Sequence, residues 1–590
     1  MSKPNIISNS FRSLIEHTSA SQKKRLSLLS VLIFFSAILD VVGLAAVVPV
    51  IKAGTDLEII HSNEYLNALY STLDFSSEKY FVLFLIGILL GYFFFKTAFG
   101  IFVNWVQARL SSDITVSIAK NQFEKYFHLD FIDYNQIKSS LMIRNILYNP
   151  TSYTQWIVQP LMMLFSETVI LVLIVGAIAY YNLFLLVFVI ITIGPATYLV
   201  YRGLKKESTK VGEGIDAVFP YTISSLTEAI NGYIDINLAD KLGMYKKKYA
   251  RHYKDYQDLQ QKAYLLNQIP LRTNEVIAVL GIILIFLYAM FIAEPGTDVI
   301  ILVGAFAAAA YRLMPSINRI LNSLMYINKN QVSIDNLYAF NDRLPKEGSG
   351  SEDSRVSFEE EIGFNNVSFS FPGSSVPVIN DLSLAIRKGE SVGFVGSSGS
   401  GKTTLMNLLL RFFIEDSGSL TVDGMKLGRQ HTAQWRKLIG YVKQDVFIMD
   451  GTIRENITLG DPEYDEAELW SAIKQASLDS FVRSLPNGLE TEVGEKGSNL
   501  SGGQRQRIGI ARSLYRKAEI LVFDEATSAL DSDTENEVTE AINALSSTNK
   551  TMFIIAHRVT TLRNCDRIYE LKEGKVDGIY TYEQVIERVI

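Results

Sequence analysis

A glycine-rich octapeptide in the second half of the chain has the residue types and spacing of a phosphate-binding loop. It runs from Gly396 to Thr403 as Gly-Ser-Ser-Gly-Ser-Gly-Lys-Thr, between an apolar run at 391–395 and a further apolar segment. Glycines let successive backbone N–H groups turn toward one anion, and a helix N-terminus adds the positive end of its dipole. In the order strand, loop and helix, this motif predicts a cradle for a nucleoside triphosphate rather than a plain glycine turn.

The side chains of this loop have separate predicted roles. Lys402 would reach the terminal phosphates, and the Thr403 hydroxyl would hold Mg²⁺. The residues predicted to contact the nucleotide here are Gly396, Ser397, Ser398, Gly399, Ser400, Gly401, Lys402, Thr403 and Thr404.

Two carboxylates follow a second apolar run, at 520–523. Asp524 suits Mg²⁺ binding, and Glu525 suits polarising the water that attacks the terminal phosphate. An apolar strand that ends in Asp-Glu is common, so the pair alone is weak evidence for a catalytic site. The phosphate loop in the same domain strengthens that interpretation.

A second anion-binding segment consists of Ser501, Gly502, Gly503 and Gln504. A hydroxyl and bare glycine amides at a predicted helix N-terminus are suited to phosphate. One phosphate chain on one subunit needs only one cradle. Two cradles therefore predict that each nucleotide is held by the phosphate loop of one copy and the Ser-Gly-Gly segment of another.

The composition of the chain excludes several other kinds of partner and site. The chain has 590 residues and a net charge of −6, so its overall charge does not attract nucleic acid, and no nucleic-acid partner is expected. Cys565 is the only cysteine, which excludes an intrachain disulfide and a cysteine-based metal site. A lone packed thiol is favoured over a catalytic one.

The first half contains six apolar stretches long enough to cross a bilayer as helices, which takes about 20 residues each. They are 26–51, 80–105, 158–180, 182–201, 276–292 and 299–314. Residues 1–25 are polar, and the apolar stretch behind them is too long for a signal peptide, so it is interpreted as the first span.

Basic residues beside the spans predict the orientation. They gather before the first span, between spans two and three, and between spans four and five, whereas the other connections are acidic or short. Both termini and the phosphate loop are therefore expected in the cytoplasm, with the spans in a plasma (inner) membrane of bacterial type. The two long cytoplasmic segments keep helical periodicity, which predicts helical extensions that meet at tips near 131–143 and 230–242.

These patterns predict a fold in two parts. Residues 1–342 would form a membrane α-helical domain with cytoplasmic extensions, 343–355 a flexible polar linker, and 356–590 a cytoplasmic α/β P-loop ATPase domain with a mostly parallel sheet. The two tips are expected to touch such a cytoplasmic domain.

Taken together, these motifs resemble those of an ATP-binding cassette (ABC) exporter half-transporter, whose membrane domain precedes its ATPase. The resemblance covers nearly the whole chain and implies ATP and Mg²⁺ as ligands in an alternating-access cycle. It places Phe371 where the family stacks adenine on a tyrosine, Gln444 at Mg²⁺, and His557 at the γ-phosphate. It also implies that 528–531 crosses a dimer interface and that 492–497 touches the membrane domain. No catalytic position is degenerate, so a homodimer would have two competent sites, and a heterodimer is not required.

Ionisable residues inside the predicted spans point to the transported substrate, because each costs roughly 2.5–3.5 kcal/mol at the bilayer centre. They are Asp40, Lys96, Glu167 and Arg312. Lys96 and Arg312, with Arg272 near the start of the fifth span, would meet an anionic headgroup. The alternative is that Lys96 forms an ion pair with Asp40 or Glu167, or that these side chains extend to an interface.

The connection after the first span bears on the cargo as well. Ile59, Leu66, Leu69 and Tyr70 approximate one helical face, which fits either an amphipathic helix on the outer membrane surface or core packing of the loop. This loop and the stretch 38–51 resemble bacterial flippases of lipid-linked oligosaccharides, so a lipid-linked oligosaccharide or related glycolipid is the favoured cargo. A multidrug, lipid or peptide exporter is the alternative within transport, and an ATP-gated channel or regulatory membrane protein is the alternative of a different class.

Overall fold

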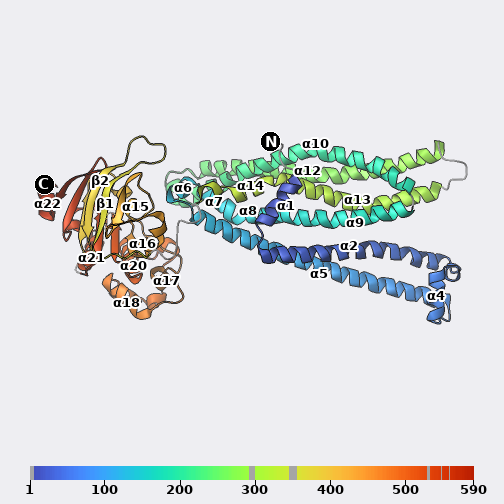
Figure 1. Cartoon of the computed structure of the whole chain (residues 1–590), viewed down its shortest axis with the longest axis horizontal. Coiled ribbons are helices and arrows are strands. Elements are labelled where there is room, and N and C mark those ends of the chain that lie inside the picture. The colour runs from blue at the N-terminus through green and yellow to red at the C-terminus, as the bar shows by residue number, and fades with distance from the viewer. Residues whose placement is uncertain are drawn as a thin grey trace. The chain divides into compact units, whose positions relative to one another are not determined.

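The computed structural model describes residues 6–181, 183–291, 299–344, 355–527, 532–546, 548–556 and 558–589. The chain divides into two compact units. The first comprises Met1–Leu129 and Tyr134–Leu344, and the second comprises Asp130–Asp133 and Pro345–Ile590. Figure 1 shows long helices in the first unit and sheets with covering helices in the second.

Six long helices within the described residues build the first unit. They are α2 (Ala20–Thr55), α5 (Glu78–Phe127), α9 (Gln159–Tyr181), α10 (Leu183–Asn231), α12 (Leu242–Phe291) and α13 (Val299–Lys329). Helix α2 packs along α5, while α9, α10, α12 and α13 pack together (Figure 1). The 50 residues of α5 extend roughly 75 Å, far more than the ~30 Å of a bilayer's hydrocarbon core.

Each predicted membrane span lies on one of these helices, apart from Val158, which precedes α9, and Asn182 and Ile292, which lie outside the described residues. Among the described residues, four segments are long and apolar enough to cross a membrane: Ala20–Gly43, Glu78–Phe127, Ser139–Tyr180 and Leu186–Asn231. The predicted spans 276–292 and 299–314 coincide with α12 and α13, although Ile292 and the connection to Val299 lie outside the described residues. The total of six spans stays a prediction.

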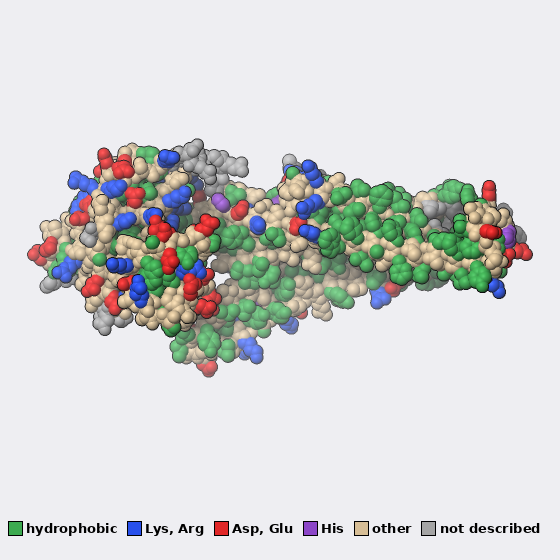
Figure 2. Space-filling model, turned by 90° about the horizontal axis from the view of Figure 1, so that it is seen from below, with side chains coloured by type: hydrophobic (Ala, Val, Ile, Leu, Met, Phe, Trp, Pro, Cys, Tyr) green, Lys and Arg blue, Asp and Glu red, His purple; other side chains and the backbone are tan. Residues whose placement is uncertain are grey.

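The outer surface of the helices is apolar. Phe94 and Ile101 on α5 are 69% and 64% exposed, and Leu28 on α2 is 60% exposed. Figure 2 shows hydrophobic side chains over much of the helical unit, whereas Lys, Arg, Asp and Glu are interspersed on the other unit. Soluble proteins rarely expose such continuous apolar surface, so it is typical of contact with membrane lipid.

The connection between α2 and α5 forms two short helices, α3 (Ile59–Ser62) and α4 (Glu64–Thr72). The Tyr70 ring packs edge-on against Phe81 at 5.3 Å, and Leu66 belongs to the same cluster. Leu69 is 38% exposed and Tyr65 is 84% exposed. Leu66 and Tyr70 therefore pack inward, as core packing of the loop requires, while Leu69 and Tyr65 are exposed; a position on the outer membrane surface stays a prediction.

Two stretches of π-helix lie in the segment that leads into α9. The π-helical segments η1 (Arg144–Tyr148) and η2 (Thr154–Val158) alternate with α7 (Ser139–Ile143) and α8 (Asn149–Tyr153). This segment packs against α10 and α14 (Gln331–Tyr338). Stretches of π-helix are rare in proteins and are frequent at functional sites.

The second unit contains two sheets, with strand orders β10-β9-β3-β8-β7-β6 and β2-β1-β4-β5. The strands are β1 (Glu361–Phe369), β2 (Ile379–Arg387), β3 (Ser391–Val395), β4 (Ser417–Val422), β5 (Met425–Lys426), β6 (Ile439–Val442), β7 (Ile520–Asp524), β8 (Thr551–Ile555), β9 (Arg567–Lys572) and β10 (Lys575–Tyr580). All pairs of the larger sheet are parallel except β9 with β10, which confirms the predicted mostly parallel sheet. The smaller sheet is antiparallel and was not predicted.

The central strands of the larger sheet are buried on both faces. Two hydrophobic cores cover these strands, with helix α15 (Lys402–Leu409) in one core and helices α20 (Gly502–Tyr515) and α21 (Ser532–Ser546) in the other. Because both faces are covered, β7 and β8 are apolar along nearly their whole length. Parallel strands bring their carboxyl ends to one edge, where ligands of such sheets bind. The residues that follow β3, β6, β7 and β8 therefore share one edge.

The single cysteine is buried in the folded protein, which predicts an unreactive thiol. Cys565 is buried, and burial raises the pKa of its thiol to about 12, with a further contribution from Asp566. Because the thiolate is the nucleophile, we expect N-ethylmaleimide to leave the native protein unlabelled near neutral pH and to label it after unfolding. Mass spectrometry of the intact chain measures this, and rapid labelling of the native protein would contradict the packed position.

Candidate active site

The phosphate loop connects β3 to α15 and depends on glycine at its bends. Gly396, Gly399 and Gly401 have φ of 147°, 81° and 103°, a region that other residues rarely adopt. A Cβ added at Gly396 would lie 2.3 Å from the Leu571 carbonyl oxygen, and one at Gly401 would lie 2.8 Å from Ile379. Strands β9 and β2 therefore leave no room for a side chain at Gly396 and Gly401, whereas at Gly399 the positive φ alone favours glycine.

Lys402 and Ser400 show that this loop fits an anion. Lys402 is 7% exposed, and its ammonium group donates to the carbonyl oxygens of Gly396 (2.7 Å) and Ser397 (3.0 Å). Burial lowers the pKa of Lys402, while the nearby Glu525 and Asp524 carboxylates oppose that shift. The buried Ser400 hydroxyl has no hydrogen-bond partner among the described residues. Phosphate oxygens would satisfy both groups.

The two predicted carboxylates lie at the end of β7. The Tyr441 hydroxyl, on the neighbouring strand β6, donates to Asp524 Oδ2 at 3.0 Å. Burial raises the pKa of Asp524, the Tyr441 hydrogen bond lowers it, and Glu525 raises it again. Glu525 turns out of the strand at φ 52°, and its N–H donates to the Ile555 carbonyl at 3.0 Å. Both carboxylates therefore lie at the shared edge, close enough to Lys402 to affect its pKa.

Gln444 follows β6 at the same edge. Its carbonyl oxygen accepts a hydrogen bond from Gln506 Nε2 at 2.5 Å, and the carbonyl of Lys443 accepts one at 3.0 Å. The backbone of this loop is thereby tied to α20, while the Gln444 side chain is exposed. His557 and residues 528–531 lie outside the described residues, although β8 ends two residues before His557 in the sequence.

Phe371, the predicted adenine platform, is 42% exposed. Its ring meets Phe413 edge-on at 5.5 Å and Phe369 at 5.4 Å. The strand pair that carries it reaches the phosphate loop, because the Val378 N–H donates to the Phe369 carbonyl and the Val378 carbonyl faces Gly401. An exposed ring held by other aromatic rings is suited to stacking on a base.

The second anion-binding segment begins α20. Ser501 is the N-cap, and its hydroxyl accepts from the Gln504 N–H (3.2 Å), while Gln504 Oε1 accepts from the Ser501 N–H (2.8 Å). A Cβ added at Gly503 would lie 1.9 Å from a methyl group of Thr534 on α21. Gly502 and Gly503 thus form the first turn of a well-capped helix.

The two anion-binding segments have different surroundings. The phosphate loop contacts β2, β9 and the turn at Gly574, whereas the Ser501 segment contacts α21 and residues near Gly497. No hydrogen bond joins the two segments within the described part of the chain. Among the described residues, the two segments are therefore held in place by different elements.

The predicted substrate-pathway residues differ in their surroundings. Lys96 Nζ lies 2.7 Å from Asp40 Oδ1, so the ion pair with Asp40 is formed and the one with Glu167 is not. Glu167, 3% exposed, instead pairs with Arg319 at 2.7 Å, which sequence reasoning missed. Arg272 is exposed and pairs with Glu275 at 3.3 Å. The side chain of Arg312 lies outside the described residues.

Sequence reasoning also left Tyr441 and Asp130 without a role. The register of β6 with β7 places Tyr441 beside Val522, from where its hydroxyl reaches Asp524. No local sequence pattern indicates this pairing. Asp130 pairs with Arg429 at 2.9 Å, and the Phe131 ring lies 4.7 Å from that of Phe412, all within the second compact unit. The first predicted tip, 131–143, begins at this contact.

The fold and site define a P-loop ATPase joined to a helical region of membrane type. A family model described as ABC transporter matches residues 379–528. The ATP-dependent lipid A-core flippase of Thiobacillus denitrificans is 30% identical over 479 residues, which are 80% of each chain. That of Bordetella avium is 27% identical over 476 residues, again 80% of each chain.

A solved structure, that of a bacterial Atm1-family ABC exporter with ATP bound, has the same fold. The TM-score is 0.79 at 22% identity, over 96% of this chain and 98% of the other. The chain belongs to the ABC transporter family, as an exporter half-transporter in which ATP hydrolysis is coupled to transport.

Proposed function

We propose that this exporter works as a dimer that flips a lipid-linked oligosaccharide or a related glycolipid across the inner membrane. The observation that carries the proposal is the likeness to lipid A-core flippases over 80% of the chain, a length that exceeds the ATPase unit and so extends into the helical unit. Lipid A-core is itself a glycolipid. Both termini and the ATPase would lie in the cytoplasm, because basic residues gather on that side of the predicted spans.

The ATPase residues would act together on one phosphate chain. The loop from Gly396 to Thr404 and the Lys402 ammonium would hold the phosphates, and Phe371 would stack on the base. Thr403, Gln444 and Asp524 would hold Mg²⁺, whose charge neutralises the phosphates and would offset the cost of burying the Asp524 carboxylate. Glu525 would orient the attacking water, and His557 would contact the γ-phosphate.

The dimer follows from the two separate anion-binding segments. If the Ser501 segment of one copy completes the phosphate loop of the other, each site needs both copies. The tip formed by α11 (Tyr233–Leu238) supports a second contact between copies, because Tyr233, Ile234 and Leu238 are 69%, 69% and 83% exposed. Exposed apolar side chains at a helix tip favour burial against a partner.

Mixed dimers test the shared site. We expect a dimer of one Lys402→Ala copy and one Ser501→Arg copy to hydrolyse ATP, because one of its two composite sites keeps both wild-type segments. The matched control carries both substitutions on one copy beside a wild-type copy, and it should be inactive since each site then has one damaged segment. Differently tagged copies allow both dimers to be purified for ATPase assays. Activity in the control but not in the first dimer would show that each site lies within one chain.

The cargo is tested by the ATPase response to added lipid. Nanodiscs would contain a polyprenyl-pyrophosphate oligosaccharide, the same carrier without its sugar, a lipid A-core glycolipid, or phospholipid alone. Stimulation by either glycolipid above the sugar-free carrier supports the proposal. If added dyes, phospholipid alone or added peptides are instead the only compounds that stimulate, the protein is a multidrug, lipid or peptide exporter, respectively. ATP-dependent ion conductance without lipid movement would identify the channel.

A further inference from the structure

A polar and aromatic cavity of about 230 Å³ is lined entirely by residues of the first unit. Its lining residues come from η1, α8, η2, α10, α12, α13 and the start of α14. All of its lining residues lie outside the predicted membrane spans, in the helical extensions. Three lining residues are charged: Arg144, Asp216 and Lys329.

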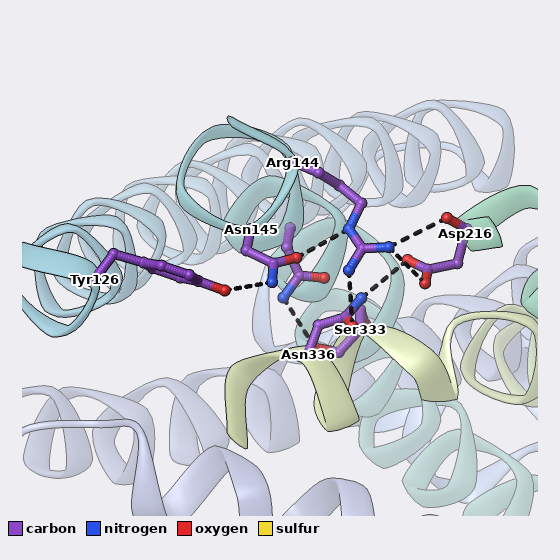
Figure 3. A network of polar contacts seen from close by, with 7 residues as sticks. Tyr126, Arg144, Asn145, Asp216, Ser333 and Asn336 are labelled. Atoms are coloured by element: carbon purple, nitrogen blue, oxygen red, sulfur yellow. Dashed lines mark hydrogen bonds and ion pairs between the residues drawn. The ribbon is translucent and has the colours of Figure 1, made fainter. Parts of the chain in front are cut away.

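One wall is a closed polar network around Arg144 (Figure 3). Its guanidinium donates to Asp216 Oδ2 (2.8 Å), to Asn336 Oδ1 (3.1 Å) and to Asn145 Oδ1 (2.9 Å). Asn336 Nδ2 donates to the other Asp216 oxygen at 2.9 Å, and Asn145 Nδ2 donates to the Tyr126 hydroxyl at 2.6 Å. Arg144 and Asp216 therefore neutralise each other and form a fixed frame rather than a free binding group.

Lys329 is the cation that this frame does not neutralise. No carboxylate lies within ion-pair distance of its ammonium in the part of the chain that the structure describes, and burial alone lowers its pKa. The ammonium lies over the rings of Trp156 (5.1 Å) and Tyr326 (5.8 Å). The charged lining residues thus sum to one positive charge, held at a partly buried position that favours an anion.

A row of aromatic rings also lines the cavity. Tyr148 meets Phe219 edge-on at 5.0 Å, and Phe219 lies 5.5 Å from Tyr256. Tyr148 comes from η1, and Trp156 comes from η2, so both π-helical segments supply rings to the cavity. Aromatic walls with a few polar groups are typical of sites that hold a planar organic ligand.

We propose that this cavity binds a small organic anion that carries a planar ring. The anionic group would contact Lys329, and the ring would lie against Trp156 and the Tyr148–Phe219–Tyr256 wall. The volume suits a single ring with one phosphate or carboxylate better than a whole lipid. Because α10, α12 and α13 all line the cavity and also carry predicted spans, occupancy would bias the conformational equilibrium of the transporter, whatever its cargo.

Pyridoxal 5′-phosphate is a suitable probe because it combines a planar ring, a phosphate and an aldehyde. The neutral Lys329 amine would attack the aldehyde carbon, water would leave, and the resulting imine would be reduced by borohydride to a stable secondary amine. Excess ATP with Mg²⁺ protects Lys402 in the full-length protein. Peptide mass spectrometry then gives the labelling rate at Lys329 and at the exposed Lys210, which pairs only with Glu207 among the described residues.

We expect the Lys329 rate to saturate with probe concentration, as binding before reaction requires, while the Lys210 rate stays linear. Phenyl phosphate should slow labelling of Lys329 at about tenfold lower concentration than inorganic phosphate, since only the former has a ring to stack. Trp156→Leu should abolish saturation, and Tyr256→Leu provides a second test if the first variant unfolds. A linear Lys329 rate, or equal protection by the two phosphates, would overturn the proposal.

Discussion

Replacing Glu525 with glutamine is expected to lower the rate of ATP hydrolysis by about 10²–10⁴-fold while nucleotide binding persists. Glu525 leaves β7 at the edge where Lys402 and Asp524 also lie, and its backbone is fixed by the hydrogen bond to Ile555. The amide keeps the size of the carboxylate but cannot accept a proton from the attacking water. Phosphate release from purified protein and binding of a fluorescent ATP analogue measure the two effects separately.

Glu587→Gln on the exposed helix α22 (Tyr582–Val589) is the matched control, because it makes the same change in charge away from the site. It should retain the wild-type rate. If Glu525→Gln hydrolyses ATP within about threefold of wild type, far from the expected range, another group must orient the water.

Replacing Gly212 with alanine is expected to lower the free energy of unfolding by about 3 kcal/mol, near the upper end for overpacking. A Cβ at this position on α10 would lie 1.7 Å from the Lys329 carbonyl oxygen, and a backbone atom of α13 cannot move aside as a flexible side chain can. The variant would therefore separate α10 from α13, the two helices that carry one side of the cavity. Differential scanning fluorimetry of the detergent-solubilised protein measures the shift in midpoint.

Gly203→Ala on the same helix is the control, since nothing lies within 4 Å of the position its Cβ would take. Alanine has the higher helix propensity, so this variant should melt at the wild-type temperature or above it. Equal destabilisation by both variants would show that loss of glycine, and not the close approach at Gly212, is responsible.

Local motifs were enough to predict the ATPase centre. The octapeptide and the strand that ends in Asp524 carry their own context, because strand, loop and helix follow one another along the chain. The parallel sheet then brings Lys402, Asp524 and Glu525 to one edge without any further information. The roles of these three residues, like those of Thr403, Gln444 and His557, stay predictions.

Contacts between distant segments could not be predicted in the same way. The hydrogen bond from Tyr441 to Asp524 depends on the register of β6 with β7. Sequence reasoning considered only Lys96 as a partner for Glu167, and the structure pairs Glu167 with Arg319 from another helix. The cavity beside Lys329 is likewise built from seven elements, and none of its walls has a sequence pattern of its own.

ATP-driven flipping is the most direct test of the proposed activity. The protein would be reconstituted in liposomes with a fluorescent polyprenyl-pyrophosphate oligosaccharide, and loss of headgroup accessibility from the ATPase-facing leaflet would be followed after adding ATP and Mg²⁺. The proposed function predicts loss of accessibility with the wild type and none with Glu525→Gln. Full ATPase activity without any movement of the glycolipid would contradict it.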